Sequence, residues 1–245
     1  MPSVWFRFYA DLNDFMPAHR RARRFIHVLR EPASVKDTIE ALGVPHPEVD
    51  LILVNGTPVD FSQALHDGDR VAVYPRFEAI DLGDVRRVGA DVPDPLRFVL
   101  DTHLRKLASY LRLAGFDATV LEDDSDIARA GARETRVVLT RDRGLLKRND
   151  VRWGCWIRST DPQAQFVELV RRFTLAPQAR PFTRCLRCNG LLEPVAKDAV
   201  AGRLLPRTRA DVDEFHLCGT CGRVYWRGSH YQRLSCFLQR SLGRA

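Results

Sequence analysis

The stretch FVLDTHLRKLASYLRLAGFDATVL, residues 98–121, changes its hydrophobic period twice. Residues 98–100 are apolar and end at Asp101, which is typical of a short buried strand. Apolar side chains then recur at helical spacing from Leu104 to Leu111, and residues 118–121 return to the pattern of a strand. A strand, a helix and a second strand in this order favour a parallel sheet with helices on its faces.

The same alternation continues to about residue 175. The pattern predicts a helix opened by Asp124-Ser125-Asp126, two further strands, and a helix that begins with a cap and a proline in its first turn. These elements are expected at Asp124 to about Arg133, Arg136–Thr140, Trp153–Arg158, and from Asp161-Pro162 onward.

Aspartates follow the predicted strands. Asp101 and Asp142 each come directly after one, where the carboxyl ends of parallel strands form sites. Asp126, or its neighbour Asp124, can supply a third carboxylate. Mg²⁺ and Mn²⁺ prefer such oxygen ligands and can activate a water for attack on a phosphodiester. The alternative is structural: Asp101 and Asp126 cap helices, and Asp142 lies in a turn.

Basic side chains flank these acids. Lys106 lies beyond Asp101, and Arg141 and Arg143 lie on either side of Asp142. A phosphodiester that approaches carboxylates needs cations to offset repulsion and to position it. The three side chains are therefore candidate substrate-binding residues, with solvated surface charges as the alternative.

Four of the six cysteines form two C-x-x-C pairs, Cys185/Cys188 and Cys218/Cys221, with 29 residues between the pairs. Two such pairs can present four thiolates tetrahedrally to one structural Zn²⁺ ion. Disulfides are the alternative, but no secretory signal precedes them. The remaining two, Cys155 and Cys236, are expected to be buried small apolar residues.

The first 80 residues have a different pattern. Two strands and a helix capped by Ser34 come first. A third strand then ends at the hairpin signal Asn55-Gly56, and a fourth follows the turn at Asp67-Gly68-Asp69, which together predict a small β-grasp sheet around one helix. This stretch resembles ubiquitin-like sulfur carriers. Those proteins act through a free C-terminal Gly-Gly, which is missing after Tyr74, so docking to a partner protein is expected rather than sulfur transfer. The predicted strands are Val4–Tyr9, Phe25–Leu29, Leu51–Val54 and Val71–Tyr74.

Length and charge agree with several modules and a polyanionic partner. The chain has 245 residues and a net charge of +7, and residues 151–245 carry 16 basic against 7 acidic residues. A basic surface attracts nucleic acid, although an arginine-rich composition gives the same excess. No apolar run is long enough to span a membrane, and no signal peptide is apparent, so a cytoplasmic protein is expected.

The motifs together resemble the Mut-seven C-terminal RNase family, which is grouped with PIN-like nucleases and carries a zinc ribbon. The resemblance implies an RNase site that uses Mg²⁺ or Mn²⁺ on Asp101 and Asp142, with Asp126 or Asp124 as the middle acid. It also implies a ubiquitin-like domain before the nuclease. The matching residues are 98–101, 104–117, 136–143, the paired cysteines, and 225–230.

The expected fold is therefore multidomain, α+β and α/β. We expect a β-grasp domain at 1–80, a linker at 81–96, a PIN-like parallel α/β domain at 97–176, and a zinc ribbon with a tail at 177–245. The predicted function is a metal-dependent ribonuclease whose basic ribbon helps bind RNA. The alternative is a non-catalytic RNA-binding or adaptor protein.

Overall fold

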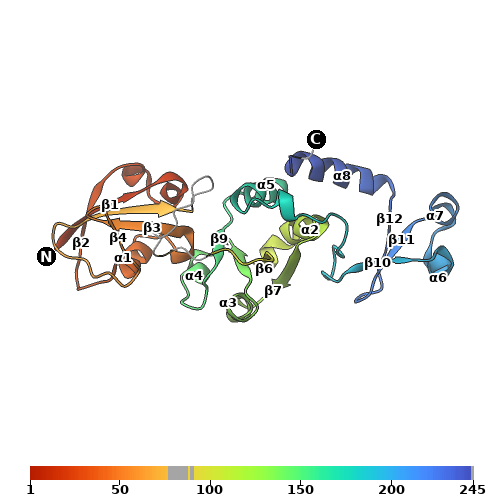
Figure 1. Ribbon diagram of the computed structural model, residues 1–245, viewed down its shortest axis with the longest axis horizontal. Coiled ribbons are helices and arrows are strands. Elements are labelled where there is room, and N and C mark those ends of the chain that lie inside the picture. Colours follow the sequence, from red (N-terminus) through yellow and green to blue (C-terminus); the bar gives the residue numbers. More distant parts are fainter. Residues whose placement is uncertain (77–87, 89–90, 244–245) are drawn as a thin grey trace. The chain divides into compact units, whose positions relative to one another are not determined.

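The structure is a computed structural model that describes residues 1–76, 88 and 91–243 (Figure 1). Its chain divides into two compact units. The first contains Met1–Asp94 and Asp123–Ile157, and the second contains Pro95–Glu122 and Arg158–Ala245. Most of the predicted linker, residues 81–87 and 89–90, lies outside the described residues. The predicted domain boundaries stay predictions.

The N-terminal part of the first unit is a β-grasp-like sheet with one helix, as the sequence predicts, but it has five strands instead of the four expected. The strand order is β2-β1-β5-β3-β4, and β1 and β5 form a parallel pair at its centre. Alternate side chains of β1, such as Phe6 and Phe8, are fully or almost fully buried against Ile39 of α1. The elements are β1 (Ser3–Phe8), β2 (Phe25–Val28), α1 (Val35–Ala41), β3 (Val49–Val54), β4 (Thr57–Pro58) and β5 (Arg70–Pro75).

Local signals explain the turns of this sheet. The Ser34 hydroxyl accepts a hydrogen bond from the backbone N–H of Asp37 at 3.1 Å and caps α1. Asn55 and Gly56 both have positive φ angles, 53° and 88°, which is the conformation of a two-residue hairpin turn. The helix cap and the hairpin turn thus have the physical basis that the sequence predicts.

The central part of the chain contains parallel sheet in both units. In the second unit β6 pairs with β7, and in the first unit β8 pairs with β9, each in parallel. The predicted strand and helix order is confirmed, with one short additional helix, α4, after Asp142. The elements are β6 (Arg97–Asp101), α2 (Arg105–Leu113), β7 (Asp117–Leu121), α3 (Asp124–Arg133), β8 (Val137–Thr140), α4 (Arg143–Leu146), β9 (Gly154–Trp156) and α5 (Pro162–Arg172).

Aromatic packing holds the helices of the second unit together. Phe98 of β6 meets Phe173, at the end of α5, edge to face, with the ring centroids 6.0 Å apart. Phe237 of the C-terminal helix packs between Tyr110 of α2 and Phe166 of α5, at 4.7 Å and 5.7 Å. The apolar faces of these helices therefore form one core with β6.

The C-terminal part is a three-stranded antiparallel ribbon followed by a helix. The strand order is β10-β11-β12, and both C-x-x-C pairs lie at the ends of its strands or in the loops beside them. Two short helices lie between β10 and β11. The elements are β10 (Leu192–Val195), α6 (Lys197–Val200), α7 (Pro206–Asp211), β11 (Phe215–Cys218), β12 (Val224–Trp226) and α8 (Ser229–Ser241).

The two unpaired cysteines differ in exposure. Cys155 on β9 is fully buried, as predicted. The expectation for Cys236 is wrong: it is exposed, because the next two residues of α8, Phe237 and Leu238, take the buried face of that helix. Across the described part of the chain, every helix is too short or too polar to cross a membrane.

Candidate metal-dependent nuclease site and cysteine centre

Asp101 is the last residue of β6 and also the N-cap of the turn that follows. Its carboxylate Oδ1 accepts a hydrogen bond from the backbone N–H of His103 at 2.9 Å. The side chain is half-buried. An ionised carboxylate offers about four lone-pair positions, so a cap bond and a metal ligand can share one aspartate.

Asp142 stands two residues after β8, and it caps α4. Its Oδ1 accepts from the N–H of Gly144 at 2.7 Å, while its own N–H donates to the Thr140 hydroxyl at 2.9 Å. A Cβ at position 144 would lie 3.1 Å from Asp142 Oδ1, so glycine lets the carboxylate fold over the helix end. The exposed side chain of Asp142 is therefore held at a defined place.

The middle acids lie in the first turn of α3. Asp123 is the N-cap, and hydrogen bonds from Ser125 and from the N–H of Asp126 lower its pKa. Asp126 pairs with Arg129 at 2.8 Å, and Asp124 is exposed in the same turn. The structure thus assigns a capping role to Asp123 and leaves Asp124 and Asp126 outside that role.

Arg148 is a residue of this region that the sequence analysis missed. Its guanidinium makes two hydrogen bonds to Asp150, both at 3.1 Å. This contact and, more weakly, the charges of Asp124 and Asp123 raise its pKa. Arg148 therefore brings positive charge close to the acids of α3. Its position six residues after Asp142 follows no periodic pattern, so the sequence carries no signal for it.

The carboxylates are not gathered as tightly as the cysteines. Among the residues that the structure describes, Cys185, Cys188, Cys218 and Cys221 are the only group of three or more Cys, His, Asp or Glu side chains with ligand atoms within 4.8 Å of one another. Asp126 and Asp142 belong to the first unit, and Asp101 belongs to the second. A shared metal site on the aspartates remains a proposal.

The three predicted cations have different surroundings. Lys106 and Arg141 are exposed, but Arg143 is half-buried. The Arg143 guanidinium lies 4.3 Å from the ring centroid of Trp156 and 5.1 Å from that of Phe15. A guanidinium stacked in this way is held by cation–π attraction and can still donate hydrogen bonds from its edge.

The N-terminal domain also holds the segment that carries Asp142. Lys147 lies at the end of α4, and its ammonium donates a hydrogen bond to the carbonyl of Glu40 at 2.6 Å. Glu48, 1% exposed, accepts from the N–H of Trp156 at 2.6 Å. The Trp156 ring in turn donates to the Arg141 carbonyl at 3.2 Å. These contacts link the ubiquitin-like region to the residues beside a candidate catalytic acid.

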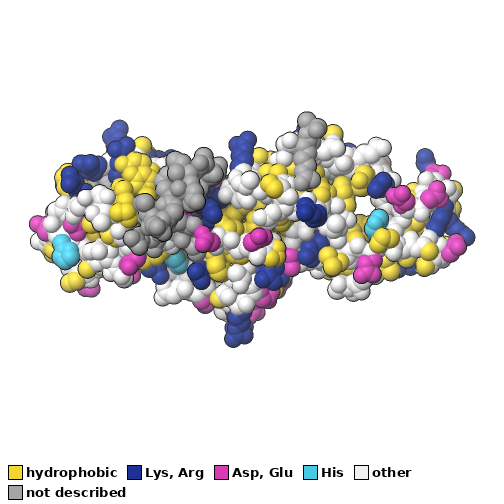
Figure 2. Space-filling model, viewed as in Figure 1, with side chains coloured by type: hydrophobic (Ala, Val, Ile, Leu, Met, Phe, Trp, Pro, Cys, Tyr) yellow, Lys and Arg dark blue, Asp and Glu magenta, His cyan; other side chains and the backbone are white. Residues whose placement is uncertain are grey.

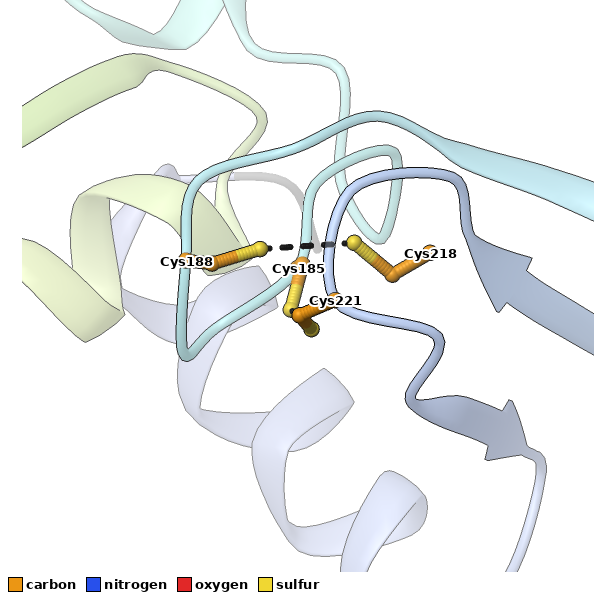
Figure 3. Close-up of side chains that lie close together, drawn as sticks. All are labelled: Cys185, Cys188, Cys218 and Cys221. Atoms are coloured by element: carbon orange, nitrogen blue, oxygen red, sulfur yellow. Dashed lines mark hydrogen bonds between the residues drawn. The ribbon is translucent and has the colours of Figure 1, made fainter.

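The four paired cysteines form a compact centre at one end of the ribbon (Figure 3). The Sγ atoms of Cys188 and Cys218 lie 3.4 Å apart, and those of Cys185 and Cys221 lie 3.6 Å apart. Four sulfurs at about 2.3 Å from one ion in a tetrahedron would have closely similar separations. The centre could therefore hold a metal ion such as zinc.

Tyr225 of β12 completes this centre. Its hydroxyl lies 3.1 Å from Cys185 Sγ and accepts from the N–H of Leu186 at 3.1 Å. Burial opposes ionisation of Cys185, but hydrogen bonds from Tyr225 and backbone N–H groups lower its pKa to about 6. Burial raises the pKa of Cys188 to about 12. A bound cation would favour the thiolate form at every position.

A buried arginine of α2 joins the first cysteine pair to the nuclease region. Arg112, 7% exposed, donates from Nε to the Ala118 carbonyl at 2.8 Å and from Nη1 to the carbonyls of Leu186 and Arg187, both at 3.0 Å. Asn189 adds a bond from its Nδ2 to Asp117 at 2.7 Å. The sequence places Arg112 on a predicted helix but does not reveal its burial, because two of its three partners, the carbonyls of Leu186 and Arg187, lie 74 and 75 residues away.

We predict that Arg112→Met destabilises the second unit by about 3 kcal/mol, because one buried carbonyl and two partly buried carbonyls lose a charged donor. Urea unfolding of the full chain measures the change. The matched control is Arg105→Met on the same helix, where an exposed pair with Glu122 is lost and the change should stay below about 0.5 kcal/mol. Equal effects of the two substitutions would contradict this role of Arg112.

The positive charge of the ribbon is partly paired. Lys197 meets Asp213 at 2.9 Å, and Arg227 meets Glu214 at 3.6 Å. Figure 2 shows acidic and basic side chains interspersed over the C-terminal part on the face that it draws. The excess of basic residues is real, but on this face it does not form one continuous patch.

Two family models match this chain, and together they extend from its N-terminal part through the cysteine ribbon into α8. Residues 96–238 match the Mut7-C RNAse domain, and residues 1–81 match the Mut7-C ubiquitin domain. A comparison with curated proteins finds no match. Two solved structures are similar to part of this chain: small archaeal modifier protein 1 of H. volcanii (21% identity, TM-score 0.26) and a putative molybdopterin converting factor, subunit 1, from Pyrococcus furiosus (26%, 0.25). Each alignment covers 31% of this chain and 100% of the other. Because the RNase-domain match spans more than half of its residues, the chain belongs to the Mut7-C RNase family.

Proposed function

We propose that this protein is a ribonuclease that hydrolyses RNA phosphodiester bonds with Mg²⁺ or Mn²⁺ bound to Asp101 and Asp142, with Asp126 or Asp124 as the third acid. The match to the RNase domain over residues 96–238 is the observation that carries the proposal. The positions of Asp101, at the end of β6, and of Asp142, two residues after β8, support it.

Each side chain has a defined part in the proposed reaction. The carboxylates of Asp101 and Asp142 hold the ion, and their cap bonds keep them from rotating away. A bound Mg²⁺ or Mn²⁺ ion supplies a more acidic water and offsets charge on the phosphate oxygens. Lys106, Arg141 and Arg143 bind the phosphates that flank the scissile bond, and stacking on Trp156 orients Arg143.

We propose a structural Zn²⁺ ion for the four cysteines. Two of their sulfur separations are close to those of a tetrahedral thiolate site, and all four sulfurs lie within 4.8 Å of one another. In such a closed site no position remains for a reacting water. The ion would fix the ribbon, whose net positive charge then contributes to RNA binding.

One observation favours a second candidate, a non-catalytic RNA-binding adaptor. Asp101, Asp123, Asp142 and Asp161 all cap helices or turns, which gives each carboxylate a structural use without a metal. Helix capping alone is worth about 1 kcal/mol per residue, so such aspartates need no catalytic explanation.

A cleavage assay separates the two candidates. We expect the purified full chain to cut end-labelled single-stranded RNA when Mg²⁺ or Mn²⁺ is added, and to leave it intact in metal-free buffer. Omitting metal, rather than adding a chelator, avoids removing zinc from the cysteine centre. Binding of RNA without cleavage over a range of RNA sequences and both metals would favour the adaptor.

A further inference from the structure

The outward face of the N-terminal sheet differs in composition from the rest of its domain. Strand alternation buries Val4, Phe6 and Phe8, and turns Trp5 and Arg7 of β1 to the outside. The register places Trp5 opposite Arg70 and Arg7 opposite Ala72 on β5. We call Trp5, Arg7, Tyr9, Leu53 of β3, Arg70 and Ala72 together the outer sheet face.

A hollow of about 290 Å³ lies on this face, close to the lower limit for small-molecule sites. Its lining includes three arginines, Arg7, Arg24 and Arg70, and two aromatic residues, Trp5 and Tyr9. None of its lining residues is acidic. Residues 1–90 as a whole carry 11 basic and 13 acidic residues, so the positive charge in the hollow reflects local sorting and not an overall basic domain.

The exposed Trp5 ring on this face can stack with a planar ligand. Trp5 is 39% exposed, and its neighbour across the strand pair, Ile26, is 52% exposed. Tyr9 stacks on Tyr74 with centroids 4.2 Å apart, and the Arg7 guanidinium lies 4.8 Å from the centroid of the Tyr9 ring. The sheet therefore presents supported aromatic surfaces beside guanidinium groups.

We propose that the outer sheet face binds a short segment of single-stranded RNA, with a base stacked on Trp5 and phosphates paired to Arg7, Arg24 and Arg70. Sheets that bind single strands use this combination of stacking rings and cations. A duplex cannot offer unstacked bases, and a hollow of this size fits a nucleotide-sized group. The identity of the strand as RNA rests on the proposed ribonuclease function, whereas the stacking and charge of this face do not.

The test measures RNA affinity by fluorescence anisotropy, with the full chain carrying Asp142→Asn and no added divalent metal. We expect Trp5→Ala to weaken binding at least about fivefold and Trp5→Phe to preserve it, because loss of one base stack has this magnitude. Arg7→Gln with Arg70→Gln should lower the slope of log Kd against log salt by about 1.4, as expected for two lost phosphate contacts. Arg30→Gln, at an exposed arginine of the same domain outside the hollow, is the matched control and should change the slope by less than half as much.

The proposal is overturned if Trp5→Ala and the double arginine variant both retain the affinity and the salt slope of the parent. A protein partner would then be the expected ligand of this face. Duplex RNA that binds as tightly as the single strand, with the same dependence on Trp5, would also overturn it. Because no cleavage is measured, a chain that lacks ribonuclease activity can still pass this test. A chain that cleaves RNA can still fail it.

Discussion

Asp142→Asn is expected to reduce metal-dependent RNA cleavage by at least about 100-fold while the fold survives. The lost negative charge removes a ligand for the divalent ion, and such ions contribute several kcal/mol to the transition state. Asparagine caps a helix about as well as aspartate, so the bond from Gly144 to position 142 can persist. The rate is measured on end-labelled RNA at saturating Mg²⁺ or Mn²⁺.

The control for this substitution is Asp161→Asn. Asp161 also caps a helix, α5, by accepting from the N–H of Ala164 at 2.8 Å, but it lies five residues after the end of β9, whereas Asp142 lies two residues after β8. We expect the cleavage rate of the Asp161→Asn variant to remain within about twofold of that of the parent. Equal rates for both variants and the parent would show that the Asp142 carboxylate is a cap and nothing more.

Removal of the proposed zinc ion is expected to unfold the ribbon. A structural zinc ion contributes roughly 10 to 16 kcal/mol of apparent binding free energy in small zinc domains, which is comparable to the total stability of a domain. The native chain should contain one zinc per molecule by elemental analysis. After chelation, or in Cys218→Ser, the amide protons of β10, β11 and β12 should lose their protection from hydrogen exchange.

The exposed Cys236 provides the matched thiol control. Cys236→Ser should retain one zinc and the full exchange protection of the ribbon. A native preparation with far less than one zinc, and exchange rates that chelation does not alter, would mean that hydrogen bonds such as those of Arg112 and Tyr225 suffice to hold the cysteine pairs together.

Elements with strong local signals could be predicted from the sequence. The Ser34 cap, the Asn55-Gly56 turn and the alternation along β1 depend on neighbouring residues, and the structure contains all three. Helix α4 is missing from the predictions because its four residues are too few to show a helical period. Strand β4, with two residues, is missing for the same reason.

Only the part of the candidate site whose residues follow a characteristic spacing could be predicted from the sequence. The two C-x-x-C pairs identify the cysteine centre directly. Arg112 and Glu48 are harder to find, because a buried charge looks like a surface charge until its partner is known. Those partners, the Leu186 carbonyl and the Trp156 N–H, lie 74 and 108 residues away.

The central claim is that Asp101 and Asp142 hold one hard divalent ion. The most direct test is the anomalous scattering of Mn²⁺ in crystals of the full chain grown with that ion. The account predicts an anomalous peak at about 2.1 to 2.3 Å from a carboxylate oxygen of each of the two aspartates, within the range for small divalent ions bound by oxygen. Ordered density for both side chains, with no peak between them at millimolar Mn²⁺, would contradict it.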